Sequence, residues 1–202
     1  RVGSGSNFEF SYNSRRYRNG KWGYRFGLQS EKDDYIAFED HHKKINLGIN
    51  FSPKDNLRIW MFLNHHSRTN WLNRISDNYY GTYDQKRTSI NIGSRWYPTN
   101  NQELQIKLEA TSFRNQKGTG WNADNNGLLV STNEAADSIN LGKLGFQIRY
   151  RYEIDPLSNI YLVYTRGGSY FFDDAADTSK IFRTTWQEPE GNVFSAKIRY
   201  RF

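Results

Sequence analysis

The sequence predicts an all-β protein, an antiparallel up-and-down transmembrane β-barrel with about nine strands. Apolar and polar residues alternate along most of the 202-residue chain, which is the period of a β-strand. Aromatic residues make up 16% of the chain, and such residues favour strands and membrane–water interfaces. Short turns and long polar loops alternate between the predicted strands, a rhythm typical of barrels that cross a membrane.

The alternation defines nine strands. In the last stretch, NVFSAKIRYRF, Phe194 and Ile198 fall on one face, while Lys197 and Arg199 fall on the other. The other eight predicted strands span residues 7–17, 21–30, 43–52, 57–66, 86–97, 102–113, 141–154 and 159–168. No segment shows a convincing helical period, so we expect no helix.

The connections between these strands come in two sizes. The short ones contain Pro, Asn, Asp or Gly, the residues that turns require, and span 18–21, 52–56, 97–102 and 155–159. The long ones are polar and irregular, and span 31–40, 67–85, 114–137 and 169–190. In a transmembrane barrel the short turns face the periplasm and the long loops face outside.

The two faces of the predicted strands suit different surroundings. The apolar face has rings with polar tips near the strand ends, such as Trp22, Trp96 and Tyr150, which suits contact with outer-membrane lipid. The polar face suits a hydrated lumen. A soluble β-sandwich or ligand-binding barrel would also alternate, and it stays the alternative fold.

Basic residues outnumber acidic ones on the predicted inward face, so we expect an anionic solute. The basic residues assigned to the lumen are Arg25, Lys44, Arg58, Arg87, Arg95, Lys107, Arg149, Arg151, Lys197, Arg199 and Arg201. The chain's net charge of +7 does not indicate nucleic acid as a partner, because these cations alternate inward and have Glu among them.

Composition excludes several other classes. The chain has no Cys, so it has neither disulfides nor thiolate metal sites. Its longest apolar run, residues 59–63, is far shorter than the roughly 20 residues of a transmembrane helix.

The strand count predicts a missing piece. If the last of nine antiparallel strands runs toward the periplasm, the first strand also runs toward the periplasm. Bacterial barrels usually have an even number of strands, so that the first and last strands run in opposite directions. We therefore expect residues 1–202 to be a single β-barrel domain that forms the C-terminal portion of a longer chain.

All four histidines fall in one predicted hairpin. Pairing Ile49 with Ile59 across the turn sets Gly48 beside Trp60 and places His42 opposite His66, where two imidazoles could share a metal ion. The alternative is that both are polar rim residues. We expect no other cofactor.

Sequence motifs for an enzyme are missing: the chain has no G-x-S-x-G, Walker A or H-E-x-x-H motif, although a rim-active outer-membrane enzyme stays an alternative. Asp33–Asp34 and Asp173–Asp174 are interpreted as solvated loop charge. The oxygen-rich stretch 122–127, NADNNG, lacks the helix-loop-helix spacing for Ca²⁺.

Two stretches resemble known outer-membrane proteins. The alternating final strand with Phe202 at its end resembles the C-terminal signature that the barrel-assembly machinery recognises in bacterial outer-membrane proteins. The stretch LGFQIRYRYEIDPLSNIYLVYTRG, residues 144–167, resembles the penultimate hairpin of a family of large outer-membrane barrels. In that family a barrel domain of unknown function follows a family-9-like carbohydrate-binding domain.

The resemblance implies a bacterial outer-membrane location and porin-like work. The expected function is passage or binding of an anionic or saccharide solute, or anchoring of an N-terminal domain that this chain lacks.

Overall fold

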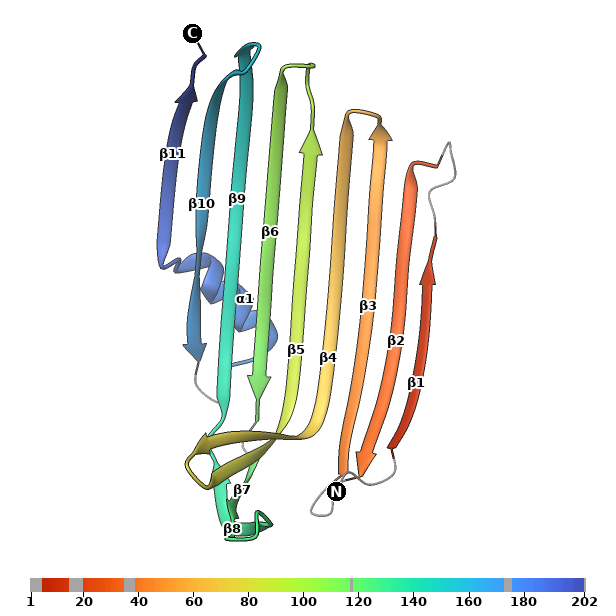
Figure 1. The fold of residues 1–202 in the computed structure, drawn as a ribbon, viewed down its shortest axis with the longest axis vertical. Helices are drawn as coiled ribbons and strands as arrows, with labels where there is room; N and C mark the ends of the chain where they lie inside the picture. The colour runs from red at the N-terminus through yellow and green to blue at the C-terminus, as the bar shows by residue number, and fades with distance from the viewer. Residues whose placement is uncertain (1–4, 15–19, 35–38, 117, 173–175, 202) are drawn as a thin grey trace.

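The chain forms one large antiparallel sheet in a computed structural model, which confirms the all-β, up-and-down fold class (Figure 1). The structure describes residues 5–14, 20–34, 39–116, 118–172 and 176–201. Neighbouring strands pair in the order β1-β2-β3-β4-β5-β6-β9-β10-β11, and the sheet is not closed.

The elements have the following bounds. The strands are β1 (Gly5–Asn13), β2 (Trp22–Asp34), β3 (Glu39–Lys54), β4 (Leu57–Ser76), β5 (Tyr79–Trp96), β6 (Gln102–Asn115), β7 (Gly118–Ala123), β8 (Leu129–Ala136), β9 (Ile139–Asp155), β10 (Ser158–Phe172) and β11 (Gly191–Arg199), and the helix is α1 (Thr178–Gln187).

The nine strands predicted from alternation are the nine strands of the main path. Short turns join β3 to β4, β5 to β6 and β9 to β10 at one end of the sheet, the top of Figure 1, which we call the turn end. The longer connections gather at the opposite end, which we call the loop end. The predicted turn 18–21 falls partly outside the described residues, and Phe202 falls outside them.

All four predicted long loops contain strand residues, since β10 also runs to Phe172 inside 169–190. β2 and β3 reach into residues 31–40, β4 and β5 extend through most of 67–85, and β7 and β8 form a hairpin within 114–137. Polar residues on both faces hide the strand period in these parts, so the prediction of irregular loops there was wrong.

Helix α1, in the fourth predicted loop, corrects the expectation that the chain has no helix. Its N-cap is Asp177, whose carboxylate accepts a hydrogen bond from the Lys180 backbone N–H at 2.7 Å. That bond is the main reason why the pKa of Asp177 lies below its usual range. Ile181 and Thr185 are fully buried against the sheet. No helix among the described residues is long and apolar enough to cross a membrane.

Each strand of the main path presents one polar and one apolar side. The row Tyr24–Ile49–Met61–Ile92–Leu108–Phe146, paired from strand to strand, defines the apolar face. The adjacent row Arg25–Gly48–Phe62–Asn91–Glu109 defines the polar face. Helix α1 packs on the apolar face near the loop end, because Ile181 lies against Gly142 and Trp186 contacts Phe146.

The register of the histidine hairpin differs from the predicted one by two residues. Ile49 pairs with Met61 instead of Ile59, so His42 lies opposite Arg68 and His66 lies opposite Lys44. The cause is the turn: Lys54 pairs with Leu57, which leaves only two residues in the bend instead of five. A two-residue slip keeps every side chain on its face, so the assignment of faces survives.

Disulfide crosslinking distinguishes the two registers. Directly opposed residues have Cβ atoms about 4.5–5.5 Å apart, whereas diagonal neighbours are roughly 7–8 Å apart. We expect a Lys44→Cys/His66→Cys pair to oxidise readily and a His42→Cys/His66→Cys pair to oxidise slowly, measured by gel mobility under mild oxidation. Faster crosslinking of the 42/66 pair would restore the register expected from the sequence.

Two glycines on β9 test the docking of α1. A Cβ at Gly142 would lie 2.7 Å from both the Ile181 and Thr185 methyl carbons, whereas a Cβ at Gly145 would have nothing within 4 Å. We expect Gly142→Ala to weaken helix docking by about 1–3 kcal/mol through overpacking and so to speed hydrogen exchange in α1. Gly145→Ala is the control and should leave that exchange unchanged.

Candidate functional site

The polar face gathers the basic residues that the sequence assigned to a lumen. All of them except Arg201, which follows the last strand, lie on this face in the observed registers. Arg58, Arg95, Gln105 and Arg149 form one continuous row across four strands. That this face lines a lumen stays a prediction.

Carboxylates balance only part of this charge. Glu103 lies 3.4 Å from Arg95 and 3.6 Å from Arg151, so one carboxylate serves two guanidinium groups. Arg58 and Arg149 instead donate to the side-chain amides of Asn50 and Gln147. Because these amides are neutral, the face keeps an excess of positive charge.

A hollow of about 840 Å³ lies on this face. It extends from Ser11 on β1 to Lys107 on β6, so the sheet curls toward its polar side. The hollow is open to solvent and lined by cations and amides, which suits a polar solute.

Two aromatic rings, Trp60 and Phe62, also line the hollow. Trp60 covers Gly93 and Phe62 covers Gly48, at distances that would exclude a Cβ on either glycine. The prediction that Trp60 would lie beside Gly48 was wrong by the same two-residue slip. Trp60 donates from its indole nitrogen to Asn91 at 2.9 Å, which fixes the ring.

The sequence did not single out this aromatic platform as functional. The available signal was that the stretch 57–64 is apolar on both faces. Aromatic rings on the polar face of a strand do not contribute to its apolar face, so they indicate another role. Flat rings beside charged groups can stack on a ring-containing solute.

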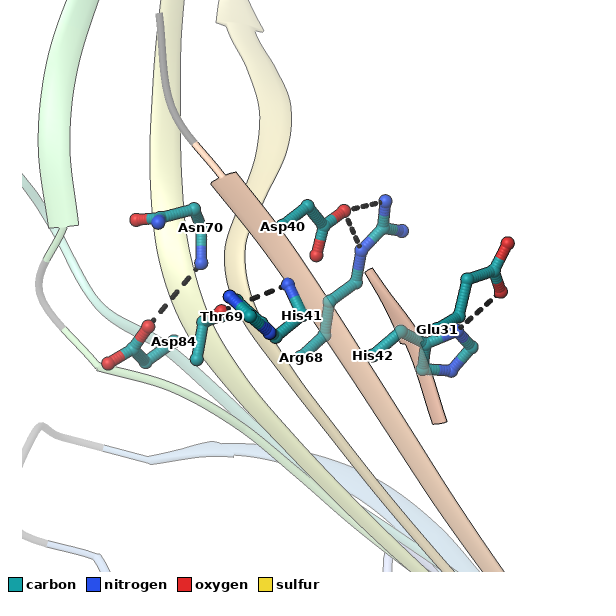
Figure 2. Close-up of polar contacts among 8 residues, drawn as sticks. All are labelled: Glu31, Asp40, His41, His42, Arg68, Thr69, Asn70 and Asp84. Carbon is teal, nitrogen blue, oxygen red and sulfur yellow. Dashed lines mark hydrogen bonds and ion pairs between the residues drawn. The ribbon is translucent and has the colours of Figure 1, made fainter. Parts of the chain in front are cut away.

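The histidines lie nearer the loop end. The rings of His42 and His66 have centroids 4.2 Å apart, although the two residues are diagonal and not directly opposed. Figure 2 shows Glu31 beside His42, at 3.5 Å from its Nδ1, and Asp40 held by Arg68. The Arg68 Nε donates to Asp40 at 2.6 Å.

This cluster is richer in positive than in negative charge. A second hollow, of about 640 Å³, is lined by His42, Lys44, His66 and Arg87, with Glu109 as its carboxylate. The Nε2 atoms of both histidines are buried and make no hydrogen bond within the described part of the chain. Imidazole and ammonium donors together are suited to binding an oxyanion.

The predicted metal site at His42 and His66 stays a prediction with two ligands. No group of three His, Cys, Asp or Glu residues that could hold a metal occurs among the described residues. Lys44 and Arg87 would also repel a cation there.

The other candidates from the sequence are the stretch 122–127 and the two Asp pairs. Asp124 of the 122–127 stretch accepts from the backbone of Asn126 and Leu128, so its carboxylate closes the β7–β8 turn. Asp173 and Asp174 lie outside the described residues, and Asp33 and Asp34 lie at the loop end of β2.

No protein-family model matches the chain, and no curated protein is significantly similar to it.

Proposed function

We propose that this chain forms part of the wall of a transmembrane β-barrel in a bacterial outer membrane, and that its polar face binds or passes anionic solutes. A saccharide solute and the anchoring of another domain belong to the same proposal. The shape of the apolar surface is the observation that carries it.

The apolar face exposes many large hydrophobic side chains, more than is usual on a protein surface in water. Phe194 is 68% and Ile198 is 70% exposed, and Phe8, Tyr24 and Met61 are also exposed. Soluble proteins rarely present apolar patches larger than a few hundred Å². A soluble sandwich would bury this face against a second sheet, so the exposure favours lipid over the soluble alternative.

The exposed apolar residues form a band that crosses the sheet diagonally. In β1 the band ends toward the loop end at Phe8, whose row across the ladder reaches Phe172 in β10. In β11 it ends at Phe194, which pairs with Tyr164. The edge has therefore moved eight residues along the strands (172 − 164 = 8) from the first to the ninth strand of the path.

This displacement gives the tilt of the strands. Eight residues span about 26 Å along a strand and eight strand spacings span about 38 Å, which corresponds to a tilt of roughly 35°. Strands of outer-membrane barrels tilt by about 35–45°. Tilted strands that cross a flat lipid bilayer need an apolar band with this slope. A buried protein core does not require its apolar residues to form such a sloping band.

The turn-end edge of the band is aromatic. Trp22, Tyr24 and Trp96 lie there and are all exposed, as expected for rings at a membrane–water interface.

Antiparallel closure of the sheet requires further strands. Nine consecutive antiparallel strands leave β1 and β11 pointing the same way, so their direct pairing would be parallel. We propose that strands from elsewhere in a longer protein complete the barrel, since single-chain bacterial barrels have even numbers of antiparallel strands.

Substitutions at two adjacent positions test the membrane assignment. Ile148 lies on the apolar face near the middle of the band, and Arg149 lies on the polar face. We expect Ile148→Arg to cost about 2–4 kcal/mol of stability in lipid vesicles, because lipid cannot hydrate the charge, and Arg149→Ile to cost much less. Urea unfolding and heat-modifiable gel mobility measure this. Equal losses, or a protein that stays soluble without detergent, would contradict the proposal.

Single-channel recording tests the solute. We expect the complete barrel to be anion-selective in planar bilayers at low salt, and Arg149→Gln/Arg151→Gln/Arg199→Gln to reduce that preference. Glu103→Gln is the control of opposite sign, because it removes the carboxylate shared by Arg95 and Arg151. Screening at 1 M salt, where the Debye length is about 3 Å, should weaken the preference. Cation selectivity would refute the basic lumen.

A further inference from the structure

A row of cations borders the apolar band on its loop-end side. Lys43 pairs with Ser67, Ser67 with Lys86, and Lys86 with Arg114, so the three basic residues lie in one row on the apolar face. We call Lys43, Lys86 and Arg114 the cationic rim. Lys43 and Lys86 are exposed, and Arg114 is half-buried.

The rim contains a repulsion that the sheet itself does not relieve. Lys86 and Arg114 are directly opposed, and like charges at opposed positions destabilise a sheet. The Arg114 Nε is buried and has no hydrogen-bond partner within the described residues. An anion between these two side chains would remove the repulsion and satisfy the unpaired donor.

A carboxylate that lies near Arg114, that of Asp177, is already engaged. Asp177 is close enough for Arg114 to contribute to its lowered pKa, but its Oδ1 accepts from the Lys180 backbone and from the Ser179 hydroxyl. The helix that Asp177 caps adds two exposed cations, Lys180 and Arg183. Among Arg114, Asp177, Lys180 and Arg183, three cations therefore face one carboxylate.

The position of the rim identifies the anion. Each rim residue lies one or two rows beyond the last apolar side chain of its strand: Ile45 in β3, Ile90 in β5 and Ala110 in β6. In a bilayer this is the level at which the hydrocarbon ends and the phosphate groups of the lipids begin. Basic side chains that border an apolar surface are typical of anionic-lipid sites.

Helix α1 marks the same level. Trp186 and Phe146 form a T-shaped pair with ring centroids 5.5 Å apart, and the Arg166 guanidinium lies over the Trp186 ring. Lys180 and Arg183 on the same helix are exposed. An apolar ring directed at the band with cations beside it is the pattern of an interfacial helix.

We propose that the cationic rim binds the phosphate groups of a phosphorylated glycolipid in the outer leaflet. The inference rests on the proposed membrane location. It commits to a lipid because the three cations are continuous with the apolar band, which would hold the acyl chains. Free phosphate has no acyl chains and would make no contact with the apolar band.

The sequence offers a matched control for the test. Lys43 and Lys86 are followed directly by Lys44 and Arg87, which lie on the opposite face. We compare Lys43→Gln/Lys86→Gln/Arg114→Gln with Lys44→Gln/Arg87→Gln/Lys107→Gln, two triple variants with the same charge change on different faces. Both are made in the full-length protein, folded in detergent micelles and checked by heat-modifiable mobility.

Native mass spectrometry then measures binding of bis-phosphorylated lipid A, dephosphorylated lipid A and inorganic phosphate. We expect the rim variant to bind bis-phosphorylated lipid A roughly 100-fold more weakly, at about 1 kcal/mol per cation. The polar-face variant should keep the wild-type affinity. Wild-type binding should also weaken from 0.1 M to 1 M salt. This measurement uses the wild-type protein alone and does not depend on the folding of any variant.

Each contrary result has a defined meaning. Equal affinity for phosphorylated and dephosphorylated lipid A, or equal loss in both triple variants, would overturn the rim. Binding of inorganic phosphate as tight as that of lipid A, lost in the rim variant but kept in the polar-face variant, would overturn the lipid in favour of a free anion. A protein that never enters vesicles would overturn the proposed function together with the rim, whereas one that inserts but ignores the phosphates would overturn the rim alone.

Discussion

A continuous backbone hydrogen-bond ladder through nine antiparallel strands is the constraint on which the rest of this structure depends. Strand side chains alternate with a period of two, so a single residue of slip anywhere in the ladder would exchange the faces of every strand beyond it. The fully buried apolar core is small, and its largest members among the described residues are Tyr83 and Ile181. The ladder, and not a packed interior, therefore holds charge and hydrocarbon on opposite sides.

The alternation sets what each side can recognise at single-residue resolution. Lys43 and Lys44 are neighbours in sequence, as are Lys86 and Arg87, yet one of each pair borders the apolar band and the other lines the hollows of the polar face. The same chemistry is thus presented on both faces of the sheet. The separation costs no extra residues, because the backbone supplies it.

Sequence reasoning recovered the features that depend on this period and missed those that do not. The nine strands and the facing of Arg25 or Arg149 follow from alternation alone. The histidine register did not, because Ile59, Met61 and Leu63 are equivalent partners for Ile49, and only the tightness of the bend selects Met61. Helix α1 was missed because it is only ten residues long, with three apolar side chains in a stretch that the sequence assigned to a polar loop, and its position depends on the space left by Gly142.

The same constraint makes the open edges the decisive feature of the fold. In lipid each unsatisfied backbone N–H or C=O costs several kcal/mol, so a sheet that meets a bilayer with its apolar face cannot keep a free edge there. β1 and β11 are exposed along their whole described lengths, and they point the same way. An odd number of added strands would satisfy both edges in antiparallel fashion. If the strands cross one slab of lipid at a tilt, as proposed, the slope of the apolar band and the cations at its border follow from that tilt, and the odd number of strands leaves two parallel edges for further strands to satisfy.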